Sequence, residues 1–159
     1  MRLQRLGTVL ALFGGLAHAS VAAVVSRPYG GAGNETQHYP EWTVRDLFRE
    51  VDLEQHRVWV SFLLLERGAV TAESRCMLAL APPADADPRT WSWYHRQCHG
   101  GIGRGAFVSW GYAAAGDRAV MTVVSEARDR VAIFTFPHVN SGSYLGDAGP
   151  EPVFPILRK

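Results

Sequence analysis

Seven short β-prone segments, separated by turn signals, constrain the fold of this chain more than any other feature. The clearest is Val-Trp-Val-Ser-Phe-Leu-Leu-Leu at residues 58–65, whose few polar atoms predict a strand buried on both faces. Residues 74–80 alternate instead, with Cys76, Leu78 and Leu80 on one face. The other segments are residues 42–48, 91–95, 106–112, 119–124 and 131–136. Their spacing predicts one all-β domain, an antiparallel barrel or sandwich.

The composition divides the chain into four parts. Residues 1–19 have the pattern of a secretory signal, and residues 20–41 are a turn-rich stretch that we expect to be a flexible lead-in. The β domain occupies residues 42–137, where residues 45–56 fit a strand followed by a loop better than a short helix. The Gly/Pro-rich tail, residues 138–159, is expected to be loop-like, with Val153-Phe154 as a short edge strand.

The signal pattern predicts that the protein is secreted. Arg2 and Arg5 precede an apolar run of about eleven residues, and Ala17-His18-Ala19 places small residues where a signal peptidase cleaves. The run is too short to span a bilayer, which needs roughly 20 residues. We therefore expect cleavage after Ala19 and an extracellular mature protein with no membrane partner.

The charge balance argues against nucleic acid as a partner. The chain has 16 basic and 15 acidic residues, and removal of Arg2 and Arg5 with the signal leaves 14 basic against 15 acidic, a net charge of −1. Nucleic acids and anionic membranes attract basic surfaces, which this composition does not supply.

Two cysteines and one glycosylation triplet are consistent with the secretory pathway. In an oxidising compartment the even count predicts a Cys76–Cys98 disulfide, with two buried free thiols or pairing between chains as the alternatives. Asn34-Glu35-Thr36 matches the acceptor triplet for N-linked glycosylation, which is either used or left unmodified.

None of the motifs that mark catalytic or metal sites is complete in this chain. A strand would hold His95 and His99 about 13 Å apart, too far for one metal ion. The Gly-rich run at residues 100–105 has no helix signal after it, as a dinucleotide site requires, and no Gly-x-Ser-x-Gly elbow occurs. We therefore expect a non-enzyme with no cofactor and no bound metal.

Aromatic side chains are the remaining candidates for a binding site. Trp91, Trp93 and Tyr94 lie close together, and Trp110 and Tyr112 share one face of their segment. They form either the domain core or an exposed patch for a partner protein or a planar phenolic ligand.

The order of these features resembles the Alt a 1-like family, the secreted fungal proteins that include the Alternaria major allergen. The matching features, in order, are Trp42-Thr43-Val44, the long apolar strand, Cys76, Trp93-Tyr94 before Cys98, Phe107-Val108-Ser109-Trp110 and Ile133-Phe134-Thr135-Phe136-Pro137. The resemblance covers roughly 95 residues of the predicted mature chain.

The resemblance implies an antiparallel β-barrel with an extracellular, non-catalytic function. Family members act as allergens, elicitors of plant defence, or effectors that bind host proteins such as thaumatin-like defence proteins. The tail lacks the family's second cysteine pair, and no cysteine lies between Ser20 and Arg75, so no covalent dimer is expected. The alternatives are a β-sandwich virulence effector acting inside host cells and an extracellular binder of small phenolic ligands.

Overall fold

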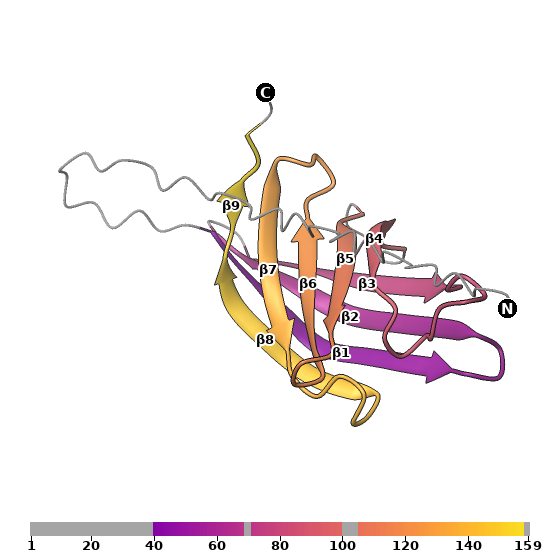
Figure 1. Ribbon diagram of the computed structural model, residues 1–159. Helices are drawn as coiled ribbons and strands as arrows, with labels where there is room; N and C mark the ends of the chain where they lie inside the picture. Colours follow the sequence, from indigo (N-terminus) through magenta and orange to yellow (C-terminus); the bar gives the residue numbers. More distant parts are fainter. Residues whose placement is uncertain (1–39, 69–70, 100–104, 158–159) are drawn as a thin grey trace, which may run out of the picture. The chain divides into compact units, whose positions relative to one another are not determined.

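The computed structural model describes residues 40–68, 71–99 and 105–157, and Figure 1 shows their arrangement. Within these ranges the chain forms nine strands: β1 (Glu41–Asp52), β2 (Arg57–Arg67), β3 (Ala72–Leu80), β4 (Trp93–Gln97), β5 (Phe107–Ala113), β6 (Arg118–Val124), β7 (Arg130–Phe136), β8 (Tyr144–Pro152) and β9 (Phe154–Pro155). The predicted signal and the Asn34 triplet lie outside the described residues.

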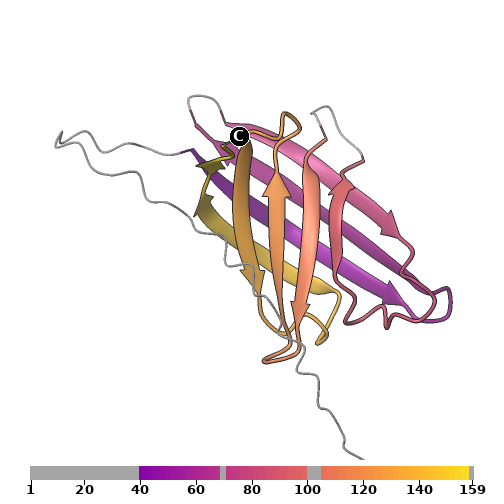
Figure 2. The same ribbon diagram turned by 45° about the horizontal axis from the view of Figure 1, so that its top comes forward.

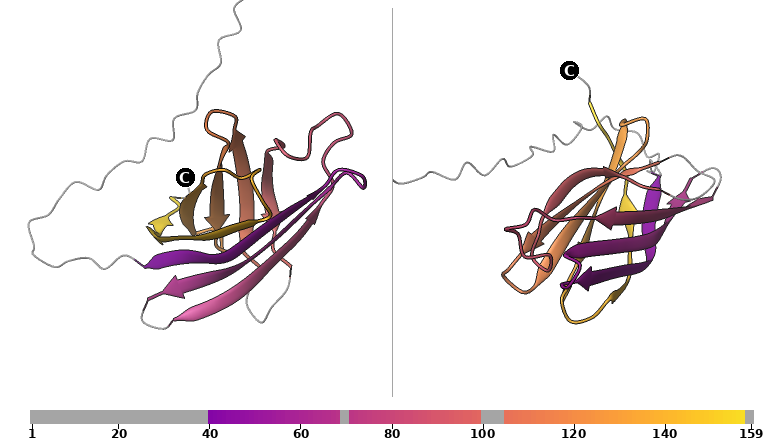
Figure 3. Two further views of the ribbon diagram at one scale, coloured as in Figure 1. Left: turned by 90° about the horizontal axis from the view of Figure 1, so that it is seen from below. Right: turned by 90° about the vertical axis from the view of Figure 1, so that its right-hand side faces the viewer.

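The strands form two antiparallel sheets that lie face to face. Sheet A has the order β3-β2-β1-β8, and sheet B has the order β4-β5-β6-β7-β9. The strands of the two layers cross at a steep angle (Figures 1 and 2), and Figure 3 shows both layers from two further sides. The prediction of an all-β antiparallel domain is confirmed, and the sheets do not close into one continuous barrel.

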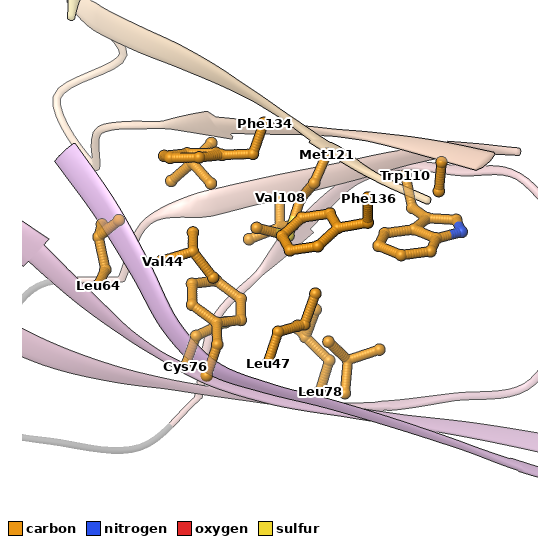
Figure 4. Packing of buried hydrophobic residues seen from close by; sticks show 14 of the residues in the cluster. Val44, Leu47, Leu64, Cys76, Leu78, Val108, Trp110, Met121, Phe134 and Phe136 are labelled. Atoms are coloured by element: carbon orange, nitrogen blue, oxygen red, sulfur yellow. The ribbon is translucent and has the colours of Figure 1, made fainter. Parts of the chain in front are cut away.

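The core lies between the sheets and follows from the alternation of side chains along each strand. Val44 and Leu47 of β1 and Leu78 of β3 point from sheet A toward Trp110 and Phe134 of sheet B (Figure 4). Each of these side chains is buried. Because successive side chains point to opposite faces, every core residue leaves its chain neighbours on the outside of the sandwich.

The prediction that residues 58–65 are buried on both faces is wrong. Val58, Val60, Phe62 and Leu64 are buried, whereas Trp59 points outward and is 42% exposed. In an antiparallel sandwich one face of each sheet meets the core and the other meets solvent. The apolar side chains of β2 therefore lie in two environments, one set in the core and the other on the outer face of sheet A.

A loop-like tail was also predicted, and the structure instead places β8 within it. β8 pairs with β1 along most of its length, and Val153 then leads into β9, which pairs with β7. The glycine and proline residues of β8, which normally interrupt a strand, are tolerated because β8 is an edge strand with an irregular register. At Gly149, where φ is +102°, an added Cβ would lie 2.8 Å from the Trp42 carbonyl oxygen. Glycine therefore permits β8 to approach β1 this closely.

The sheets are connected at two corners. The predicted disulfide is present and joins Cys76 of β3 to Cys98, just after β4. Beside it, the Met77 and His99 backbones exchange two hydrogen bonds with N–O distances of 2.9 and 3.1 Å. At the opposite corner the chain crosses from β8 in sheet A to β9 in sheet B. These links hold both layers around the core.

Candidate protein-binding face

A bulge in β1 decides which side chains of that strand face outward. Asp46 has a φ of +52°, and the pairing of β1 with β2 shifts register between Arg45 and Phe48. Beyond the bulge Leu47 and Arg49 point into the sandwich, so Phe48 points out. The backbone N–H of Asp46 donates to Asp147 Oδ1 at 2.9 Å, which ties the bulge to β8.

Four large apolar side chains lie on the outer face of sheet A. Tyr144, Phe48, Ser61 and Met77 occupy one row across β8, β1, β2 and β3, because each is the registered partner of the next. Trp59 lies two residues from Ser61 on the same face of β2. We call Phe48, Trp59, Met77 and Tyr144 the apolar face.

The apolar face is open to solvent. Its members are 38% (Phe48), 42% (Trp59), 49% (Met77) and 63% (Tyr144) exposed. Cross-strand neighbours on one face of a sheet lie within side-chain reach, so these four form one surface rather than isolated residues. The half-buried side chains of Leu63 and Leu65 extend the surface along β2.

Charged groups border this surface on β1, β3 and β8. Arg45 and Arg75 flank Leu63 in the neighbouring row, and the Arg45 Nε lies 3.9 Å from Asp147 Oδ2. The Tyr144 hydroxyl donates to Asp46 Oδ1 at 3.3 Å. Desolvation raises the pKa of Tyr144, and the hydrogen bond to Asp46 raises it further. The hydroxyl therefore stays protonated at neutral pH and keeps its hydrogen bond to Asp46.

The outer face of sheet B differs in chemistry. At its centre the outward positions of β6 and β7 carry Val120, which is 41% exposed, Thr122, Ile133, which is 50% exposed, and Thr135. These side chains are smaller than those of the apolar face, and none of them is aromatic. Sheet B thus supplies an exposed apolar surface of different chemistry on which control substitutions can be made.

The aromatic residues predicted as binding candidates do not form one patch. Trp93 and Trp110 are buried in the core, and Trp91 packs partly buried against it. Tyr94 is 72% exposed on β4, while Tyr112 is half-buried on β5. Of the two interpretations, the exposed patch is therefore wrong for Trp93 and Trp110, because the alternation of β4 and β5 turns both indoles into the core.

Tyr112 instead belongs to a polar network around the buried Arg49. The Arg49 guanidinium lies 5.5 Å from the Trp110 ring centroid and donates to the Pro88 and Arg89 carbonyl oxygens at 2.9 and 3.0 Å. Desolvation lowers the pKa of Arg49. Burial raises the pKa of Tyr112, which interacts with Asp117. With its donors directed at backbone carbonyls, Arg49 holds the loop after β3 against the end of the sandwich.

The described residues contain no group of three or more His, Cys, Asp or Glu side chains that could hold a metal ion. His95 lies on β4 with a φ of +54°, and its ring stacks on Phe107 at a centroid distance of 4.4 Å. Cys98 is in the disulfide, and the His99 backbone pairs with Met77. His95, Cys98 and His99 thus each have a different set of contacts.

Comparison with the known protein families finds no match for this chain, and comparison with curated proteins finds none either. Among the described residues there is no helix with the length and apolar character needed to cross a membrane.

Sequence reasoning missed the apolar face, although part of its signal was present. A run of mostly apolar residues does not distinguish a covered sheet face from an open one, so the sequence predicts burial for Trp59, Leu63 and Leu65. Tyr144 lies in the segment predicted to be a loop-like tail, and its pairing with Phe48 depends on β8, which the sequence does not predict. The bulge at Asp46, which reverses the direction of Phe48, leaves no clear pattern in the sequence.

Proposed function

We propose that this protein is a secreted, non-catalytic binding protein that binds a host extracellular protein through the apolar face of sheet A. The observation that carries the proposal is the side-by-side placement of Phe48, Trp59, Met77 and Tyr144, which are 38–63% exposed.

The residue types of this face favour a protein partner. Aromatic residues and methionine are enriched in protein interfaces, and tryptophan and tyrosine dominate their binding energy. Covering apolar area contributes roughly 25 cal/mol per Å² before the entropic cost of association. Small ligands require a concave site, whereas a sheet face with outward side chains fits another extended surface.

The charged residues at the border of the apolar face indicate which charge the partner surface presents. Arg75 lies next to the apolar row and forms no ion pair within the described part of the chain. A carboxylate opposite Arg75 would complement this charge and orient the partner. We therefore expect the partner to present an apolar centre with an acidic group at its edge.

The disulfide, the signal pattern and the family resemblance support an extracellular location. The Cys76–Cys98 disulfide is compatible with an oxidising compartment. The signal pattern of residues 1–19 favours secretion, and the resemblance to the Alt a 1-like family suggests a plant defence protein, such as a thaumatin-like protein, as the partner. On this proposal the protein is a fungal effector or elicitor.

The proposal is tested by capturing host proteins on the parent protein and on variants of its apolar face. We would immobilise the disulfide-bonded protein, pass plant apoplastic fluid over it and identify the retained proteins by mass spectrometry. The double variant W59S/Y144S should lose the dominant saturable protein, while I133S on the opposite sheet should retain it. Equal retention by all three proteins would contradict binding through the apolar face.

A further inference from the structure

The backbone pairing that joins the edge strands of the two sheets stops after one pair of residues. Met77 of β3 and His99 exchange two hydrogen bonds, with N–O distances of 2.9 and 3.1 Å. In an antiparallel ladder the next such pair, two residues further along β3 and two residues back toward β4, would be Ala79 and Gln97. These two described residues form no bond with each other, so the edges of β3 and β4 separate beyond Met77 (Figure 1).

The opening between these edges holds a cavity of about 280 Å³. Leu78, Ala79 and Leu80 of β3 line one side, and residues 95–97 of β4 line the other together with His99. The volume is below the roughly 300–1,000 Å³ of small-molecule sites, so the cavity fits the end of a longer ligand better than a whole drug-sized molecule. None of the four residues of the apolar face lines it.

The backbone at both walls of the cavity has unused hydrogen-bonding groups. Backbone groups of alternate residues point to opposite edges of a strand, and Met77 uses its groups on the edge away from β2. The N–H and C=O of Ala79 therefore point to this same edge, where no described residue pairs with them. Gln97 also points its backbone groups to the opening, because the next residue, Cys98, donates to Ala106. An unpaired strand edge is a template for another extended chain.

The charge of the cavity selects which end of an extended chain it accepts. Its lining contains the guanidinium of Arg96 and the imidazoles of His95 and His99 but no carboxylate. Arg96 forms no ion pair within the ranges that the structure describes. It is the registered partner of the buried Val108, so its side chain leaves β4 on the core side of sheet B, toward the opening. A terminal carboxylate would complement this guanidinium, whereas a terminal ammonium group would be repelled.

The closed end of the opening sets the direction of the chain. The Met77–His99 pair and the adjacent disulfide close one end, so an extended chain enters from the end near Leu80. A chain that enters with its C-terminus first runs antiparallel to β3. This is the orientation that β2 already has against β3, and it is the more stable of the two.

We propose that this site binds the C-terminal end of an extended peptide by strand addition to β3. The Ala79 N–H would donate to the terminal carboxylate, and the Ala79 carbonyl oxygen would accept the N–H of the last peptide residue. Arg96 would supply the counter-charge, and the side chain of the preceding peptide residue would lie beside Leu80. Backbone pairing at a sheet edge and capture of a terminal carboxylate both recur in peptide recognition. The site is independent of the proposed protein-binding function.

Amidation of the terminal carboxylate separates this proposal from unspecific pairing with the strand edge. We would titrate the disulfide-bonded protein with the pentapeptide acetyl-Ser-Val-Thr-Val-Thr and with its C-terminal amide, and follow the assigned Ala79 backbone amide by NMR. The free acid should shift this resonance saturably. The amide should bind about ten-fold more weakly, because it loses a charge-assisted hydrogen bond and the ion pair with Arg96. Equal binding of the two peptides, or no saturable shift with the free acid, would overturn the proposal.

Variants test the two protein groups that hold the peptide. A79P removes an N–H that makes no bond to β2 and should abolish binding, and R96Q should weaken binding by about three-fold. R118Q, on β6, should leave binding unchanged, and so should Y144S, on the opposite edge of sheet A, which separates this site from the apolar face.

The R96Q variant also separates peptide capture from protection of the edge. An inward-pointing charge on an edge strand can serve to prevent pairing with other chains. Tighter or unchanged binding of the free-acid peptide by R96Q would show that Arg96 does not hold the carboxylate and would overturn the proposal.

Discussion

The disulfide between Cys76 and Cys98 connects the edge strand β3 of sheet A to the chain that leaves the edge strand β4 of sheet B, with the two Cα atoms 4.9 Å apart. Cys76 is buried in the core, beside the backbone pairing of Met77 with His99. The bond therefore joins two layers rather than two turns of one loop, and its loss affects the packing between the sheets.

Removal of this disulfide should destabilise the protein without changing its fold. The bond closes a loop with a sequence separation of 22 residues, and closing a loop of that size stabilises a protein by about 3 kcal/mol. The variant C76A/C98A should lose about that free energy of unfolding, measured by urea denaturation. An unchanged midpoint relative to the oxidised protein would contradict a stabilising role.

Arg49 should be more important for stability than an exposed arginine. R49M removes the donors to the Pro88 and Arg89 carbonyl oxygens in a buried setting, and we expect a loss of about 2–3 kcal/mol. The control R89A breaks an exposed ion pair with Asp87 and should change stability by less than about 1 kcal/mol. If the two variants unfold at the same denaturant concentration, the loop after β3 is not held by Arg49.

The sequence predicted the fold class and the disulfide because both follow from local patterns. Alternation along segments such as residues 74–80 marks a strand and its inner face, and two cysteines leave few pairings. The position of β8 depends on non-local pairing with β1, which overrides the turn-forming composition of the tail. The apolar face depends on the bulge at Asp46 and on β8 together, so strand alternation alone could not place Phe48 beside Tyr144.

Gly149 should be intolerant of a side chain. G149A places a Cβ 2.8 Å from the Trp42 carbonyl oxygen at a φ of +102°, so β8 must move away from β1. We expect a loss of about 1–3 kcal/mol, measured by thermal unfolding. G142A is the control, because an added Cβ at Gly142 meets nothing within 4 Å. Equal melting temperatures for both variants would contradict the close approach of β8.

Asp117 should make stability depend on pH in the acid range. The Asn140 backbone N–H donates to the Asp117 carboxylate at 3.0 Å, and this bond contributes most to lowering the pKa of Asp117 below its ordinary 3.8. Because the folded pKa is lower than the unfolded one, this contribution is present above pH 3.8 and is lost as pH falls through the folded pKa. D117N should be less stable than the parent at about pH 6, and the difference should shrink toward about pH 2. A difference independent of pH in urea unfolding would contradict this assignment.

If a host protein binds the outer face of sheet A, substitutions on that face should lower the affinity for the purified partner. The captured host protein would be purified, and its Kd measured by calorimetry against the parent, W59S, Y144S and I133S. We predict that W59S and Y144S each weaken the Kd by about 30-fold or more, the loss typical of central aromatic interface residues, while I133S stays within about two-fold of the parent. Equal affinities for the parent, W59S and Y144S would contradict binding through the apolar face.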